Sequence, residues 1–161
     1  MSTPQLHPAV VHLAPLLGTW SGAGAGEYPT IEAFTFTEET VFGHVGKPFL
    51  TFVQRTKGAD GLPLHTEAGY LRPVGLDKVE FVITMPSGIV ESLEGTIDGP
   101  TITLESVTVL TTATAKEVTA TRRTYTVDDD RLDWTFAMAA MGQPMTHHLA
   151  GSLTRQPAAV Q

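Results

Sequence analysis

Histidine is the residue type in this chain best suited to holding a metal or a cofactor. The sequence has no cysteine, which excludes a disulfide framework, a thiolate nucleophile, a zinc finger and an iron–sulfur cluster. Any metal must therefore be bound through histidine or a carboxylate. The six histidines are His7, His12, His44, His65, His147 and His148.

His147 and His148 are adjacent in a segment expected to be a strand. Neighbouring strand residues point to opposite faces, so at most one of the two enters the interior of the fold. A single imidazole in an apolar cavity suits axial ligation of a planar metal cofactor, because the cofactor supplies the other ligands. The competing interpretation is a histidine satisfied in the core or at the surface. The chain has no helical His-Glu-x-x-His pair and no Gly-x-Ser-x-Gly elbow.

A glycine-rich segment runs from Gly18 to Gly26. A dinucleotide-binding glycine loop must open a helix, but here Pro29, Thr30 and Ile31 follow, which disfavour a helix. We therefore predict a first strand whose glycines permit tight curvature or the close approach of another backbone or a ligand.

The elements that must position these residues are short strands. Stretches rich in Thr, Val, Phe and Ile alternate with Gly, Pro and Asp clusters at intervals of about ten residues, which is typical of an all-β sandwich or barrel. Such connections are too short for parallel crossovers, so the strands should be antiparallel, and closure into a ten-stranded up-and-down barrel removes the exposed edges. The predicted strands are Thr19–Gly26, Ile31–Phe42, Phe49–Thr56, Leu64–Leu71, Val79–Met85, Ile89–Ile97, Thr101–Leu110, Glu117–Val127, Arg131–Ala140 and Met145–Leu153.

The chain length fits one domain. We expect a single domain over residues 1–161 with a core from about residue 7 to 155, since 161 residues with 42% hydrophobic content can bury a core without disulfides. In the segment from His7 to Leu17, which precedes the first predicted strand, Val10, Leu13 and Leu17 are spaced like one face of a helix. This spacing predicts a short helix that closes one end of the barrel.

The sequence does not decide whether the barrel interior holds a ligand cavity or is filled by side chains. Barrels of more than about eight strands have room inside for a ligand. Of the adjacent Arg122 and Arg123, one could face inward and meet a carboxylate, although a solvated edge charge is the favoured interpretation. One apolar set either lines a ligand cavity or fills the core: Phe34, Phe36, Phe42, Phe52, Met85, Phe136 and Met138.

Charge and hydropathy limit the kinds of molecule that this protein is expected to bind. With 17 acidic and 10 basic residues, the chain has no basic stripe to neutralise phosphates, so nucleic-acid binding is not expected. The longest apolar run near the N-terminus, Ala9 to Leu17, is too short to span a bilayer. We expect a cytoplasmic protein that does not bind membranes.

Four separated motifs resemble the signature of the nitrobindin family, in the same order and over almost the whole chain. They are Gly18-Thr19-Trp20-Ser21-Gly22-Ala23-Gly24, Gly26-Glu27-Tyr28-Pro29-Thr30-Ile31, His44-Val45-Gly46-Lys47-Pro48-Phe49-Leu50, and Met138-Ala139-Ala140-Met141 with Gln143-Pro144-Met145-Thr146-His147-His148-Leu149.

The resemblance implies a ten-stranded antiparallel barrel, like that of fatty-acid-binding proteins, that holds ferric haem b. It also implies isomerisation of peroxynitrite to nitrate, weak binding of nitric oxide, and a homodimer. The matching positions make His148 the proximal iron ligand and Thr30 a haem contact. His44 falls near the haem pocket, beside an apolar wall with few hydrogen-bond donors.

The alternation of side chains along the last predicted strand favours His147 as the ligand instead. Leu149 and Leu153 share a face with His147, whereas His148 shares one with Ala150 and Ser152. An inward apolar face would make His147 the ligand. We favour His148, because small neighbours leave room for a porphyrin and an outward leucine pair could serve a dimer interface or a covering helix. The alternative function is a carrier or sensor of nitric oxide, haem or an apolar ligand without turnover, and for a fatty acid one buried arginine should pair the carboxylate.

Overall fold

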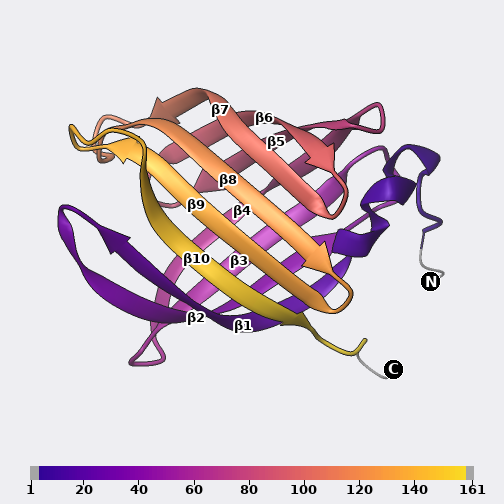
Figure 1. The fold of residues 1–161 in the computed structure, drawn as a ribbon, viewed down its shortest axis with the longest axis horizontal. Coiled ribbons are helices and arrows are strands. Elements are labelled where there is room, and N and C mark those ends of the chain that lie inside the picture. Colours follow the sequence, from indigo (N-terminus) through magenta and orange to yellow (C-terminus); the bar gives the residue numbers. More distant parts are fainter. Residues whose placement is uncertain (1–3, 159–161) are drawn as a thin grey trace.

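The computed structural model describes residues 4–158 as a closed barrel of ten antiparallel strands preceded by a short 3-10 helix (Figure 1). Each strand pairs with its sequence neighbours, and β1 pairs with β10 to close the barrel. The predicted barrel and all ten strands are confirmed, with differences of a few residues at the strand ends. The elements are η1 (Pro8–Leu16), β1 (Gly18–Tyr28), β2 (Ile31–Gly43), β3 (Leu50–Gly58), β4 (Pro63–Val74), β5 (Lys78–Met85), β6 (Ile89–Asp98), β7 (Thr101–Thr111), β8 (Val118–Asp128), β9 (Arg131–Ala140) and β10 (Thr146–Arg155).

The up-and-down topology gives the barrel two different ends. The turns β1–β2, β3–β4, β5–β6, β7–β8 and β9–β10 all lie at one end, which we call the mouth. The other four turns and η1 lie at the opposite end, which we call the helix end (Figure 1). The two candidate histidines of β10 lie near its first residue and therefore at the mouth.

The helix end is closed by η1. This segment buries Val10, Leu13 and Leu16, and their spacing of three matches the three residues per turn of a 3-10 helix. Leu16 thus takes the core position that α-helical spacing predicted for Leu17. The Trp20 indole, fully buried, donates from Nε1 to the Leu16 carbonyl at 2.8 Å. Within residues 4–158, no helix has the length and apolar character needed to cross a membrane.

The glycines of β1 make room for aromatic rings. Gly24 and Gly26 pair with Phe36 and Phe34 of β2, and a Cβ at either glycine would come within 2.3 Å of the paired ring. Each ring therefore lies across its glycine, a packing that a larger residue would block. The predicted close approach of another backbone is confirmed at Gly24, where a Cβ would also lie 2.5 Å from the Ala150 carbonyl of β10.

The interior of the barrel is filled by side chains. Phe36, Phe42 and Phe52 are buried in its core, so these members of the apolar set fill the core. Beside them lies Arg123, only 2% exposed. The favoured interpretation of both arginines as solvated was wrong for Arg123, because its strand position faces inward, where Glu67 and Glu91 meet it. Arg122 faces outward and pairs with exposed Glu105.

Candidate functional site

A β-bulge in β10 decides which histidine faces inward. His147 pairs with Ala137 and Leu149 pairs with Phe136, so His148 is an extra residue without a partner in β9. A bulge shifts the side-chain alternation by one position. As a result His147 is exposed, whereas His148 lies beside the inward-facing ring of Phe136.

The same bulge corrects our interpretation of the leucines. Leu153 is buried in the core and Leu149 packs against it. Both leucines therefore face the barrel interior, and they do not form an outward surface for a dimer or a covering helix. The parity conflict in the sequence disappears, because the bulge places His148 on the same side as these leucines.

One nitrogen of the His148 ring is held and the other is free. Nδ1 lies 2.9 Å from the backbone oxygen of Glu27. A carbonyl only accepts hydrogen bonds, so Nδ1 carries the hydrogen and Nε2 of the neutral ring keeps its lone pair. Nε2 has no hydrogen-bond partner among residues 4–158. An imidazole fixed through Nδ1 by a carbonyl is the usual state of a metal-binding histidine.

Aromatic rings surround His148. The ring centroids of Tyr28, Phe136 and Phe34 lie 5.4, 6.0 and 6.3 Å from that of the imidazole. The Tyr28 hydroxyl accepts from the Ala140 amide at 3.0 Å and donates to the Met138 carbonyl at 3.1 Å. These bonds fix the end of β1 against β9, and with it the Glu27 carbonyl that orients His148.

The surroundings keep His148 neutral. Partial burial lowers the pKa of His148, and the neighbouring His147 and His65 act in the same direction, while the Glu27 carbonyl opposes them. A neutral imidazole offers a lone pair to a metal, whereas an imidazolium does not. At neutral pH the side chain is therefore in its ligating form.

His65 is a further histidine of the site that the sequence analysis did not single out. It lies in β4, and its presence contributes to the lowered pKa of His148. Its Nε2 lies 3.4 Å from Glu67 Oε1. The sequence held a signal for this placement, because His65 shares parity with the apolar Leu71 within the predicted strand.

Thr30 and His44 fall at different ends of the barrel. Thr30 is exposed in the β1–β2 turn at the mouth, three residues beyond Glu27. His44 directly follows β2 at the helix end, where its Nδ1 accepts from Gly46 N at 3.4 Å. At ~3.3 Å per residue, the run of β2 from Phe34 to Gly43 puts the two ends roughly 30 Å apart. The structure does not bring His44 to His148, and we remove it from the candidate site.

The motif around His44 instead has a structural role. Gly46 adopts a φ of 73°, in the left-handed region that favours glycine. A Cβ at Gly46 would lie 3.1 Å from the Gln5 carbonyl. The loop therefore packs closely against the segment that precedes η1.

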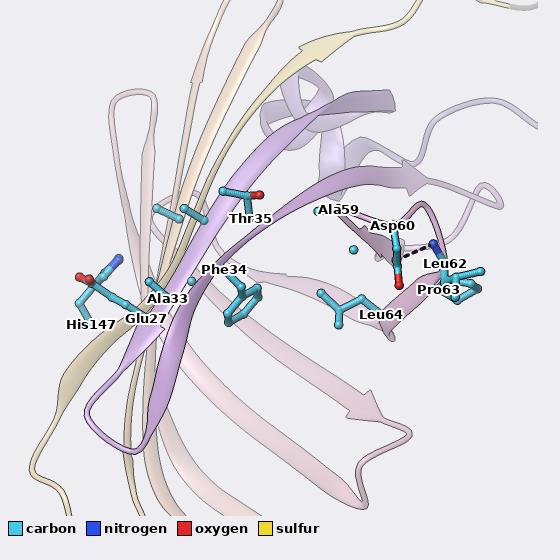
Figure 2. A pocket seen from close by; sticks show the side chains of 14 residues that line it. Glu27, Ala33, Phe34, Thr35, Ala59, Asp60, Leu62, Pro63, Leu64 and His147 are labelled. Carbon is cyan, nitrogen blue, oxygen red and sulfur yellow. Dashed lines mark hydrogen bonds between the residues drawn. The ribbon is translucent and has the colours of Figure 1, made fainter.

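A groove of about 1020 Å³ adjoins the mouth between the β1–β2 and β3–β4 hairpins. Figure 2 shows Phe34 and Leu64 within it, with Asp60 on the β3–β4 side and His147 and Glu27 across the β1–β2 ribbon. The groove shares Phe34 and Glu27 with the surroundings of His148. Its size is at the upper end of the range typical of small-molecule sites.

The interior arginine has no capacity left for a ligand. Arg123 donates from Nη1 and Nη2 to Glu67 at 2.8 and 3.0 Å, and from Nε and Nη2 to Glu91 at 3.0 and 2.6 Å. A fatty-acid carboxylate would have to displace one of these carboxylates. The arrangement thus disfavours the fatty-acid carrier.

Fold and site together define a barrel that presents one neutral imidazole, with a free Nε2, to a ligand among aromatic rings. The model of the THAP4-like, heme-binding beta-barrel domain matches residues 9–155, and the chain belongs to this family, the nitrobindin family. The resemblance drawn from the four motifs is confirmed.

Relatives of known name cover nearly the whole chain. A peroxynitrite isomerase of Nocardia farcinica is 50% identical over 155 residues, which are 93% of this chain and 92% of that protein. Peroxynitrite isomerase 1 of Mycobacterium tuberculosis is 51% identical over 162 residues, covering 96% and 99%. The crystal structure of Rv2717c from M. tuberculosis matches with a TM-score of 0.89 and 50% identity, covering 95% of this chain and 100% of that one.

Proposed function

We propose that this protein binds ferric haem b through Nε2 of His148 and isomerises peroxynitrite to nitrate, and that it also binds nitric oxide. The observation that carries the proposal is the free Nε2 of a half-buried imidazole whose Nδ1 is fixed by the Glu27 carbonyl at 2.9 Å. The names of the relatives support the reaction.

The residues present fit a haem. The donor is a neutral imidazole with an unpartnered nitrogen, and the rings of Tyr28, Phe34 and Phe136 offer flat apolar surfaces beside it. Cysteine is absent from the chain, so histidine is the axial ligand that this site supplies. Thr30, in the turn next to Glu27, is the second contact that we propose.

When bound at His148, ferric haem would supply a Lewis-acidic iron for the rearrangement of peroxynitrite to nitrate. The reaction is an isomerisation, so no atom or electron enters or leaves. The chain's contribution is to hold one imidazole neutral and oriented. The rings of Tyr28, Phe34 and Phe136 pack around that imidazole, while His65 and its partner Glu67 provide polar groups on β4.

The deciding experiment compares His148→Ala with His147→Ala. The two residues are adjacent, and His147 is exposed on the outer face, so His147→Ala is a matched control. Haemin is titrated into each purified protein, the Soret band is recorded, and the decay of peroxynitrite is followed by stopped-flow absorbance. We expect His148→Ala to lose both the band and the accelerated decay, and His147→Ala to keep both.

Two results would contradict the proposal. Loss of the haem spectrum in His147→Ala alone would assign the ligand to His147. A wild-type protein that does not bind haemin would contradict the proposal that this protein binds haem. We also propose that the protein is cytoplasmic, as its composition led us to expect, and that it is a homodimer, as the family resemblance implies. Light scattering on the holoprotein would test the dimer.

A further inference from the structure

The buried interior holds more acidic than basic groups. Its buried charged side chains are Glu38, Glu67, Glu91 and Arg123, which are at most 5% exposed. Buried charges are usually balanced by a partner of opposite sign. Here one guanidinium faces two carboxylates, and Glu38 has only the neutral donors Thr40, Gln54 and Trp134.

Glu67 and Glu91 lie one layer of aromatic rings away from His148. The carbon of the Arg123 guanidinium that they bind is 4.6 Å from the centre of the Phe136 ring. The centre of the Phe136 ring lies 6.0 Å from that of the His148 ring. The acidic layer is thus close to the ligating imidazole but sealed from solvent.

Glu67 keeps its charge at neutral pH. Burial alone would raise the pKa of Glu67, but Arg123 and the bond from His65 lower it to about 2. Glu91 receives two hydrogen bonds from the same guanidinium. Arg123 carries one positive charge, whereas Glu67 and Glu91 together carry two negative charges. One negative charge therefore remains without a partner in this group.

We propose that this surplus of buried carboxylate charge stabilises the ferric over the ferrous state of haem bound at His148. The inference rests on the proposed function. Ferric haem carries one more positive charge than ferrous haem, so a fixed negative charge nearby favours oxidation. In the interior such a charge is weakly screened, and burial and neighbouring charges are the means by which a protein sets a haem potential.

Glu91→Gln removes one charge with little change in geometry. In the native side chain, Oε2 accepts both bonds from Arg123 and Oε1 is buried without a partner. An amide oxygen can replace Oε2, and the NH₂ group occupies the place of an atom that makes no bond. The matched control is Glu105→Gln, which removes the same charge from the exposed ion pair with Arg122.

The experiment is a spectroelectrochemical titration of the haem-loaded protein. For a charge on the order of 10 Å away at an effective dielectric constant of about 20, we expect Glu91→Gln to lower the ferric-to-ferrous ratio roughly tenfold at fixed potential. This corresponds to a midpoint potential about 59 mV more positive. Glu105→Gln should change the ratio by less than about twofold, because an exposed charge is screened.

Each outcome decides the inference. An unchanged or more negative midpoint in Glu91→Gln overturns it and leaves the haem proposal intact, whereas a wild-type protein without a Soret band overturns both. If Glu91→Gln does not fold, Glu67→Gln tests the same charge surplus, because the pKa of Glu67 is lowered to about 2 and the group is charged at neutral pH. A midpoint shift to more positive potential supports the inference there, and no shift refutes it.

Discussion

Arg123 and His148 are both polar side chains that face the interior of one barrel, yet their surroundings differ. Arg123 is 2% exposed, and three of its nitrogens are bonded to carboxylates. His148 is only half-buried, and one of its two nitrogens has no partner within residues 4–158. A buried polar group with all its bonds made holds the fold together, whereas one with a bond left open is available to a ligand.

Register shifts occur beside both groups. The Arg123 network ties β4, β6 and β8 together, and the β6–β7 register shifts between Ser92 and Leu93, next to Glu91. At the mouth, the β10–β9 register shifts at His148 and the β1–β2 register shifts between Gly26 and Tyr28. A bulge re-aims a side chain, so the difference between the two groups lies in their hydrogen-bond partners and not in the regularity of the backbone.

The largest effect should come from removing the arginine of the interior network. Arg123→Met leaves Glu67 and Glu91 buried without a cation, which typically costs about 3–5 kcal/mol of unfolding free energy. Arg122→Met removes an exposed pair and should cost less than ~1 kcal/mol. Urea unfolding of both variants checks this difference, and equal losses would contradict the role that we assign to the buried network.

The acid stability of the network should come next. The pKa of Glu67 is lowered to about 2 in the folded protein from an ordinary value of 4.5. A lowered pKa gives stability that is present above pH 4.5 and is lost as the pH falls toward 2, on the order of 3 kcal/mol. Glu38, whose pKa burial raises, contributes in the opposite direction, with stability that is lost as the pH rises.

Comparison with Glu67→Gln isolates this contribution. The stability difference between wild type and variant, measured by urea unfolding at pH 5 and at pH 2.5, should shrink at the lower pH. A difference that stays constant over this range would show that Glu67 does not carry the acid dependence.

The sequence predicted the fold well and the interior poorly, for a physical reason. Each strand is defined by local alternation, as in Leu132, Trp134 and Phe136, and each turn by local Gly, Pro or Asp residues. The partners of Arg123 are 32 and 56 residues distant in the chain, so no local pattern indicates that this arginine turns inward. Its pairing follows only from the closed barrel.

The candidate site was predicted in part. Motif resemblance indicated His148, but parity favoured His147, because a bulge adds one residue without any mark in composition. The family motif also suggested His44, whose loop at the helix end serves packing around Gly46. Placement of these residues needs the register of β9 and β10, which the chain sets through long-range pairing.

A smaller effect on stability is expected at His148, the ligand that we propose. His148→Ala removes one side-chain hydrogen bond at a half-buried position, which is worth about 1 kcal/mol, although we expect the same change to abolish haem binding. Urea unfolding of the haem-free variant measures the cost. A loss as large as that of Arg123→Met would mean that the mouth, like the interior, is built for stability.

The smallest effect should be that of His44→Ala on haem affinity. His44 follows β2 at the helix end, roughly 30 Å along the strand from the residues that contact His148, and within residues 4–158 its side chain bonds only to the Gly46 amide. Haemin titration should therefore give the wild-type dissociation constant within about twofold.

His65→Ala is the informative counterpart, because His65 contributes to the lowered pKa of His148 and its removal should alter the Soret band. A haem affinity that falls in His44→Ala but not in His65→Ala would reverse our assignment of the two ends, since it would place the cofactor beside η1.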